Sequence, residues 1–449
     1  MNEDKMAILG SAPIPKALLS LGIPTMIGML INALYNLVDT YFAGGLGTDQ
    51  MGAVTVAFPL GQIIVGLGLL FGNGAAAYLS RLLGRGDKDT ANKVASTAIY
   101  SSISIGTIVI LVSLFFLKPI LKQAGAIESV MPYAITYTRI YIVFSIFNVF
   151  NVTMNNIVSS EGAAKTAMYA LIAGAILNVI LDPVFIYVLN LGIAGAATAT
   201  AISQIISMLV YLCYILRKKS VFNFSIKECY FTTEIMSEIL KIGIPTLIFQ
   251  LLTSLSISMI NNAVKEYGGS ALAAMGPVTK IMSMGTLIIF GFLKGFQPIA
   301  GFSYGAKKFD RLRPVIKTAL LWSTIFCVIF GLIAALFSTQ IVSLFTKDDA
   351  EMVRVGSIAL RANGFSFVFF GFYTVYSFLF LVMGKAAEGC ILGACRQGIC
   401  FVPVILILPS VLGLNGVLYA QPIADVISAI VTAIMAIRLH RELRIAEKR

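Results

Sequence analysis

Residues 17–39 read ALLSLGIPTMIGMLINALYNLVD, and no charged residue occurs in them before Asp39. The hydrocarbon core of a bilayer is about 30 Å thick, and a helix needs roughly 20 apolar residues to cross it. This stretch is therefore long enough for one crossing. It is also longer than the apolar core of a cleaved signal peptide, so we expect it to remain as the first transmembrane helix.

The rest of the chain repeats this pattern. Of its 449 residues, 58% are hydrophobic and only 12% are charged, whereas about 25% of the residues in a soluble domain are charged. The alternating segments of about 10 residues that are typical of a membrane β-barrel do not occur. We expect an all-α membrane protein with twelve transmembrane helices, starting near residues 17, 51, 94, 131, 166, 193, 242, 271, 318, 355, 387 and 414.

Lysine and arginine residues are concentrated on one side of these predicted spans. With the N-terminus inside, 23 of the 33 fall in inside segments and 5 in outside loops. Because positive charge favours the cytoplasmic side, both termini are expected to be cytoplasmic, in the cell membrane. The net charge of +12 then needs no nucleic-acid partner. The remaining five cations lie within spans: Arg139, Lys280, Lys294, Arg361 and Arg396.

The two halves of the chain resemble each other. The sequence Gly-Ile-Pro-Thr at 22–25 recurs at 243–246, an offset of 221 residues, and the same offset relates Gly84 to Gly305 and Ser207 to Ser428. Each half has six predicted spans, so both halves have the same orientation. This predicts two pseudo-symmetric six-helix lobes around a central cavity, as in alternating-access transporters. The expected units are an N-terminal lobe at 1–216, a cytoplasmic linker at 217–241, a C-terminal lobe at 242–440 and a cytoplasmic tail at 441–449.

Two acidic residues lie deep in the spans of the first half, at similar predicted depths. A charge at the centre of a span costs about 2.5–3.5 kcal/mol on insertion scales, so Asp39 and Asp182 indicate a functional site. Asn178 lies one helical turn before Asp182, and Thr200 reaches the same depth from the next span. Two carboxylates, an amide and a hydroxyl can hold a proton or a Na⁺ ion. The alternative is a hydrogen-bonded pair that only holds helices together.

The second half has a third intramembrane acid, Asp425. Lys280 and Lys294 lie in span 8. Two interpretations remain open for these three residues: a neutralising Lys–Asp pair, or a role in binding substrate.

Enzyme motifs do not fit this architecture. Residues 301–305 read GFSYG, which matches the G-x-S-x-G pattern, but a serine hydrolase also needs a strand and a histidine. The chain's single histidine is His440, near its C-terminal end. No P-loop occurs, so we expect no nucleotide cofactor. An intramembrane aspartyl protease is the main alternative from another class, but the duplication has no role in that scheme.

These features resemble the multidrug and toxic compound extrusion (MATE) family, and in particular its DinF-type branch. The resemblance covers the whole chain, including the stretch AVTVAFP at 53–59 and the loop RLLGRG at 81–86. Residues that match the branch's functional positions are Asp39, Asn178, Asp182, Thr200 and Tyr137, with Asn155 as a further polar position and Pro24 as the kink-forming proline. The NorM-like branch has acidic residues in spans 7 and 10, where this chain has Gln250 and no carboxylate.

The resemblance implies a transporter and not an enzyme. It implies efflux of organic, often cationic, compounds in exchange for inward H⁺ or Na⁺, with the cation at Asp39, Asp182, Asn178 and Thr200. Apart from that ion, no metal or cofactor is expected, and the protein is expected to act as a monomer. A flippase for lipid-linked precursors, from the wider superfamily, is the alternative.

Overall fold

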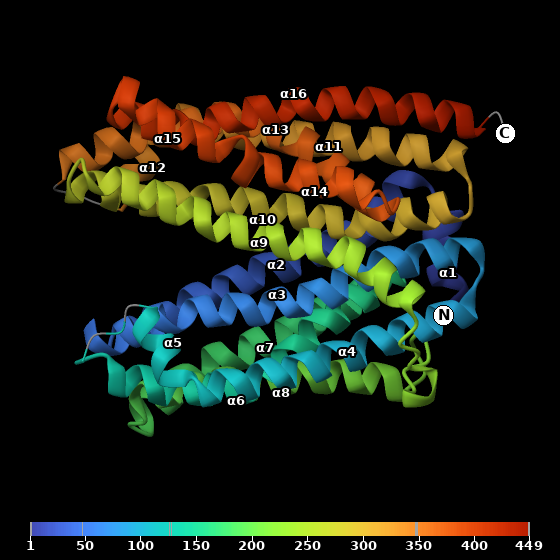
Figure 1. Ribbon diagram of the computed structural model, residues 1–449, viewed down its shortest axis with the longest axis horizontal. Coiled ribbons are helices and arrows are strands. Elements are labelled where there is room, and N and C mark those ends of the chain that lie inside the picture. The colour runs from blue at the N-terminus through green and yellow to red at the C-terminus, as the bar shows by residue number, and fades with distance from the viewer. Residues whose placement is uncertain (1, 47, 125, 127, 346–348, 448–449) are drawn as a thin grey trace.

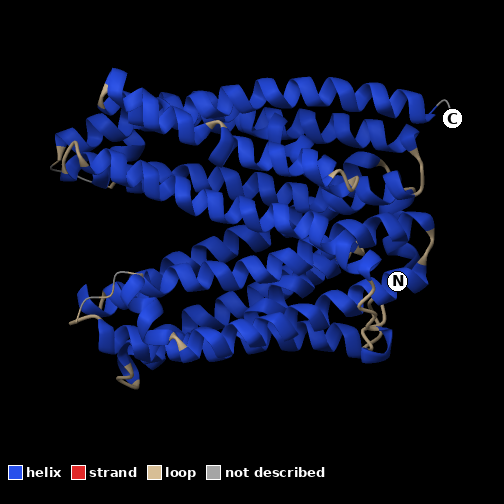
Figure 2. Ribbon diagram, in the orientation of Figure 1, coloured by secondary structure: helices blue, strands red, loops and turns tan. Residues whose placement is uncertain are grey.

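The computed structural model describes residues 2–46, 48–124, 126, 128–345 and 349–447, and their regular secondary structure is helical (Figure 2). Twelve helical spans in the described residues, one of them interrupted, are long and apolar enough to cross a membrane. Helices suit this setting because each one satisfies its own backbone hydrogen bonds where no water is available. The predicted fold class is confirmed.

The first six spans form the N-terminal lobe, which we call the N-lobe. They are α2 (Ile14–Gly44), α3 (Thr48–Arg85), α4 (Lys88–Phe115), α6 (Met131–Ser160), α7 (Ala164–Pro183) and α8 (Gly192–Leu216). Helix α2 continues through Pro24 as one helix. Helix α7 is extended by a wider π-helical turn, Val184–Val188, directly after Pro183. A proline removes one regular helical hydrogen bond at this point.

The last six spans form the C-lobe. They are α9 (Thr233–Lys265), α10 (Gly269–Gly305), α11 (Phe309–Leu336), α13 (Ala350–Val382), a split span, and α16 (Leu414–Glu447). The split span consists of α14 (Ala386–Ala394), a π-helical turn at Cys395–Ile399, and α15 (Phe401–Leu412). The short helices α5 (Leu117–Gln123) and α12 (Ser338–Ser343) begin at equivalent positions of the repeat, since 338 − 117 = 221.

The segment between the lobes is shorter than the predicted linker at 217–241. Helix α9 begins at Thr233, because the side chain of Thr232 caps its first turn by accepting a hydrogen bond from the backbone N–H of Ile235. The predicted tail after residue 440 also starts as helix, since α16 continues to Glu447.

The two lobes meet at one end of the molecule and diverge toward the other (Figure 1). Both chain termini lie at the end where the lobes meet, which we call the closed end. Helix α2 of the N-lobe packs on α10 of the C-lobe, and α3 packs on α9.

Glycines let the lobes approach closely at this contact. A Cβ atom on Gly295 would lie 2.4 Å from the backbone nitrogen of Gly22, and one on Gly74 would lie 2.2 Å from the carbonyl oxygen of Ile239. Gly74 and Gly295 occupy equivalent positions, because 295 − 74 = 221. The repeat thus places a glycine at a close backbone contact between the lobes on both α3 and α10, although the partners of the two glycines, Ile239 and Gly22, are not equivalent.

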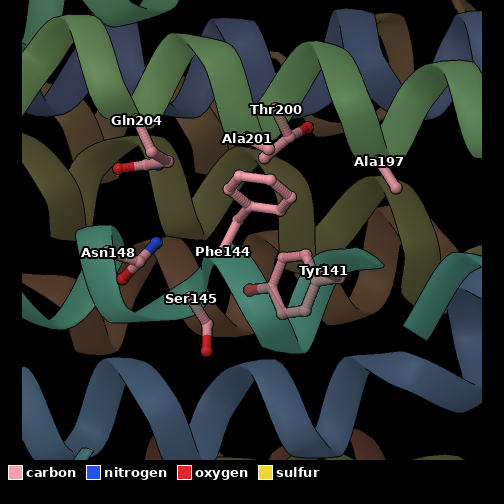
Figure 3. A pocket seen from close by; sticks show the side chains of 8 residues that line it. All are labelled: Tyr141, Phe144, Ser145, Asn148, Ala197, Thr200, Ala201 and Gln204. Carbon is pink, nitrogen blue, oxygen red and sulfur yellow. The ribbon is translucent and has the colours of Figure 1, made fainter. Parts of the chain in front are cut away.

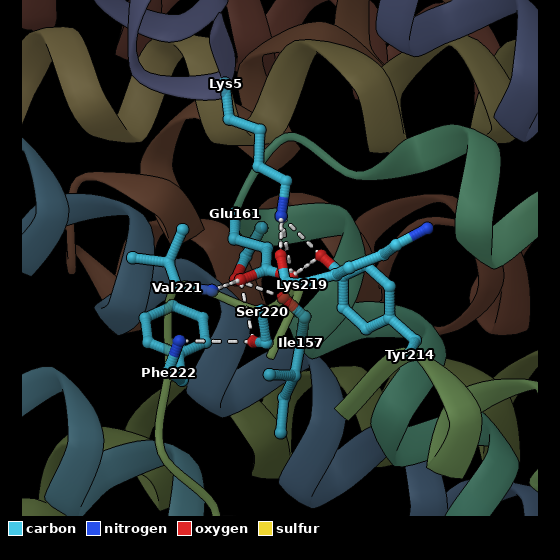
Figure 4. Close-up of polar contacts among 9 residues, drawn as sticks. Lys5, Ile157, Glu161, Tyr214, Lys219, Ser220, Val221 and Phe222 are labelled. Carbon is cyan, nitrogen blue, oxygen red and sulfur yellow. Dashed lines mark hydrogen bonds and ion pairs between the residues drawn. The ribbon is translucent and has the colours of Figure 1, made fainter. Parts of the chain in front are cut away.

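Polar contacts add to the closed end. Arg81 of α3 pairs with Glu238 of α9 across the lobes, with 2.8 Å between nitrogen and oxygen. At the N-terminal helix α1 (Asn2–Gly10), Lys5 donates hydrogen bonds to Tyr214 and to the carbonyl oxygen of Lys219 (Figure 4).

The same cluster contains Glu161, which has no exposed surface. Glu161 pairs with Lys5 and accepts hydrogen bonds from Tyr214, from the hydroxyl of Ser220 and from the backbone N–H of Val221 (Figure 4). Burial raises the pKa of Glu161, although Lys5 and these donors act in the opposite direction. The contacts tie the segment after α8 to the loop between α6 and α7.

We expect Gly295→Ala to weaken the contact between the lobes. The added methyl group meets backbone atoms that cannot turn aside, and overpacking of this kind costs about 1–3 kcal/mol. Spin labels at the exposed positions Lys88 and Lys308, in a cysteine-free background, would report the change as a smaller population with a closed end. The matched control is Gly276→Ala on the same helix, where a Cβ atom meets nothing within 4 Å. Identical distance distributions for the two variants would contradict this account.

Candidate functional site

The structure brings Asp39 and Asp182 together inside the N-lobe. Asp39 lies near the C-terminal end of α2, Asp182 lies near the C-terminal end of α7, and the two helices pack along each other. The two carboxyl groups lie close enough to influence each other's charge. Asp182 has no exposed surface, and Asp39 is partly exposed. Two carboxylates in such contact repel each other unless a proton or another cation lies between them.

Asn178 and Thr200 join the same cluster. Asn178 is 1% exposed, and its amide nitrogen donates to Asp182 Oδ1 at 3.3 Å and to Thr200 Oγ1 at 3.4 Å. The first contact arises because the two residues are one helical turn apart on α7. The second arises because α8 packs against α7. Four predicted site residues thus lie in one contiguous group.

Three oxygen atoms of this group are buried and have no hydrogen-bond partner among the described residues: Asp39 Oδ1, Asp182 Oδ2 and Asn178 Oδ1. An unpartnered buried polar atom is costly, so each one calls for an explanation. Carboxylate and amide oxygens are ligands for hard cations. No group of three His, Cys, Asp or Glu side chains suited to a metal ion occurs in the described part of the chain. Chemically, such oxygens can take a proton or a small cation.

Tyrosine side chains surround the two acids. Tyr35, Tyr137 and Tyr141 all lie within electrostatic range of Asp39. The rings of Tyr137 and Tyr141 are stacked, with centroids 6.0 Å apart. Tyr137 was expected from the family resemblance. Tyr35 and Tyr141 were not predicted, although each lies one helical turn from a predicted residue, Tyr35 before Asp39 and Tyr141 after Tyr137.

A small pocket between α6 and α8 adjoins this cluster (Figure 3). Tyr141 and Thr200 form part of its wall, so it borders the group that holds the acids. Its other polar side chains are Ser145, Asn148 and Gln204, and Asn148 Oδ1 has no partner among the described residues.

Asn155 does not belong to the acid cluster. Its amide nitrogen donates to the hydroxyl of Tyr211 at 3.1 Å, and its oxygen accepts a hydrogen bond from Lys294 Nζ at 3.2 Å. Asn155 lies on α6 and Lys294 lies on α10, so this contact joins the two lobes.

Of the two interpretations left open for Asp425, a neutralising pair with Lys280 or Lys294 is wrong. Asp425 has 1% of its surface exposed and pairs with Arg396, with 2.7 Å from Nε to Oδ1. Ser366 and Gln421 donate to the same carboxylate at 2.9 Å and 3.0 Å. Arg396 reaches Asp425 because it lies in the π-helical turn between α14 and α15. The sequence identified it as a cation within a span but gave no sign of its partner.

The other second-lobe candidates are separate from this pair. Lys280 is exposed on α10, and Gln250 is partly exposed on α9. Both carboxylate oxygens of Asp425 accept hydrogen bonds, whereas Asp39 Oδ1 and Asp182 Oδ2 have no partner among the described residues. Sequence equivalence between the lobes therefore does not extend to their polar chemistry.

Known proteins with this arrangement are transporters. The profile of the MatE family matches residues 24–184 and 245–407, one match in each lobe. The multidrug export protein MepA of Staphylococcus aureus (strain MRSA252) is 30% identical over 452 residues, which cover 99% of this chain and 98% of MepA.

Solved structures agree over almost the whole chain. One described as the outward-facing conformation of a multidrug resistance MATE family transporter has a TM-score of 0.92 and 27% identity, covering 99% of both chains. Another, described as MATE in the bent conformation, has the same score, identity and coverage. The chain therefore belongs to the MatE family of membrane transporters and is a multipass membrane protein, not an enzyme.

Proposed function

We propose that this protein exports organic, often cationic, compounds across the cell membrane in exchange for inward H⁺ or Na⁺. The observation that carries the proposal is a set of three buried oxygens, on Asp39, Asp182 and Asn178, that have no hydrogen-bond partner in the described part of the chain. In the proposal, the coupling cation occupies this site and Thr200 completes it. The names of the relatives, a multidrug export protein and a multidrug resistance transporter, support organic compounds as the cargo.

The end of the molecule where the lobes diverge, which we call the open end, faces the outside in this proposal. The distribution of lysine and arginine predicts that both termini are cytoplasmic. Since the termini lie at the closed end, the lobes diverge toward the external side (Figure 1). This state is suited to releasing a compound outside and to loading the cation from outside.

Helix α2 is the physical link between cation binding and lobe movement. Its outer part holds Asp39, and its inner part holds Gly22 and Thr25 at the contact with the C-lobe. Thr25 donates a hydrogen bond to the carbonyl oxygen of Gly291 at 2.5 Å across that contact. Pro24 lies between Gly22 and Thr25, within the contact with the C-lobe, and provides a place for α2 to bend there. A ligand changes the balance of two states only through different affinities for them, and a bend that moves Asp39 from Asp182 supplies such a difference.

A flippase for lipid-linked precursors would be expected to line its cavity with several cations. Only five lysine and arginine residues lie in the spans. One of them, Arg396, is already paired with Asp425. This favours efflux of organic compounds. The proposed cycle needs only one chain, which supports a functional monomer.

Asp39→Asn and Asp182→Asn should each reduce ethidium efflux from cells by at least about tenfold, because an amide lacks the charge that holds the cation. Asp89→Asn is the matched control, since Asp89 is exposed at the start of α4, outside the cluster. Equal membrane levels of the three variants must be verified by blotting. Wild-type efflux in both cluster variants would remove the proposed site.

Proteoliposomes with pH and Na⁺ gradients imposed separately test the coupling. We expect one of the two gradients to accelerate drug uptake by the wild-type protein, because only the ion that loads the acids contributes its gradient. The Asp39→Asn/Asp182→Asn double variant should respond to neither. Equal stimulation of the wild type and the double variant would refute the coupling role of these acids.

The C-lobe pair is expected to serve stability. Asp425→Asn leaves Arg396 without a counter-charge, and breaking one side of a buried pair costs about 3–5 kcal/mol. Thermal unfolding of the purified protein in detergent should therefore shift to a clearly lower temperature. Glu351→Gln, which breaks the exposed Glu351–Arg354 pair, should have little effect. An unchanged transition for Asp425→Asn would argue against a structural pair.

A further inference from the structure

Lys294 differs from the other four cations in the spans. Arg139, Lys280 and Arg361 are exposed, and Arg396 is paired with Asp425. Lys294 is only partly exposed, and no carboxylate of the described residues lies within ion-pair distance of its ammonium group. The contact with Asn155 Oδ1 at 3.2 Å supplies a neutral acceptor and leaves the positive charge uncompensated.

An uncompensated cation within a membrane span is costly and indicates a functional site. Lys294 also lies at a special place in the fold. It precedes Gly295 on α10, the residue whose backbone meets Gly22 of the N-lobe. Its side chain reaches Asn155 of the N-lobe, so it lies at the contact between the lobes.

Polar side chains near Lys294 form further hydrogen bonds between the lobes. Gln297, one turn further along α10, donates to Asn73 Oδ1 at 3.3 Å. Asn73 in turn donates to Thr246 Oγ1 at 3.0 Å. Hydrogen-bonding groups are thus available beside the ammonium group for a polar ligand.

Aromatic side chains lie one turn to the other side of Lys294. Phe290 precedes it by four residues, so the two share a face of α10. The ring of Phe290 is 6.0 Å from that of Phe249 on α9 and 5.9 Å from that of Phe378 on α13, measured between centroids. All three rings are partly exposed. Such a cluster can hold the apolar, aromatic body of a ligand.

We infer that Lys294 and the aromatic cluster of Phe249, Phe290 and Phe378 form a subsite for compounds that join an aromatic body to an anionic group, specifically a carboxylate. The ammonium group of Lys294 donates a charge-assisted hydrogen bond to the carboxylate in place of Asn155, while the rings contact the aromatic body. This inference rests on the proposed function and deepens it. The proposed function takes organic, often cationic, compounds as cargo, and Lys294 extends this cargo to compounds that also carry a carboxylate.

A matched pair of dyes tests the subsite by direct binding. Fluorescence anisotropy of the purified full-length protein in detergent would be measured with a rhodamine that has a free benzoate and with the methyl ester of the same dye. We expect Lys294→Gln to weaken binding of the acid by about tenfold, the loss of one hydrogen bond to a charged group, and to leave the ester unchanged. Lys294→Arg should restore the acid's affinity. Lys280→Gln, on the same helix but exposed, should change neither.

Two outcomes would overturn the inference. Equal changes for acid and ester in Lys294→Gln would assign Lys294 to the contact between the lobes. Displacement of the acid by phosphatidylglycerol added to the micelles would assign the site to a lipid headgroup. Ethidium efflux separates this test from the test of the proposed function. If cells with the wild-type protein do not export ethidium, the proposed function is wrong. If Lys294→Gln weakens binding of the acid but its cells still export ethidium, the result concerns only the subsite.

Discussion

Two carboxyl groups, those of Asp39 and Asp182, are held against each other in the N-lobe. Two ionised carboxylates repel each other, and a proton or a cation between them joins them, so this contact between α2 and α7 depends on charge. The same helix α2 carries Gly22 and Thr25 at the contact with the C-lobe. One helix therefore connects a charge-dependent contact within a lobe to the close backbone contact between the lobes.

The duplication gives both lobes the same backbone plan but not the same chemistry. In the N-lobe, buried oxygens of Asp39, Asp182 and Asn178 have no partner among the described residues. In the C-lobe, the carboxylate of Asp425 is fully occupied by Arg396, Ser366 and Gln421. An ion pair whose oxygens already accept hydrogen bonds has little to gain from an added cation, whereas oxygens without a partner can bind one. In the proposed function, the N-lobe therefore binds the ion, and the C-lobe is the rigid body against which the N-lobe moves.

Much of the fold and of the N-lobe site could be predicted from the sequence. The twelve spans follow from length and hydropathy, and the contact between Asn178 and Asp182 follows from helical spacing. The partner of Asp425 could not be predicted, because Arg396 reaches it only through a π-helical turn that interrupts its span. Likewise, nothing in the chain's composition indicates that Lys294 reaches Asn155 of the other lobe.

The sequence by itself determined the membrane class, the twofold repeat and the acids that must be buried, since these depend on local hydrophobicity and on period. The tertiary structure decided which buried charges meet: Asp39 with Asp182, Asp425 with Arg396, and Lys294 with no carboxylate among the described residues. Which charged side chains come into contact depends on the rotation and tilt of whole helices. Those are set by close contacts such as that of Gly22 with Gly295, which involve residues far apart in the chain.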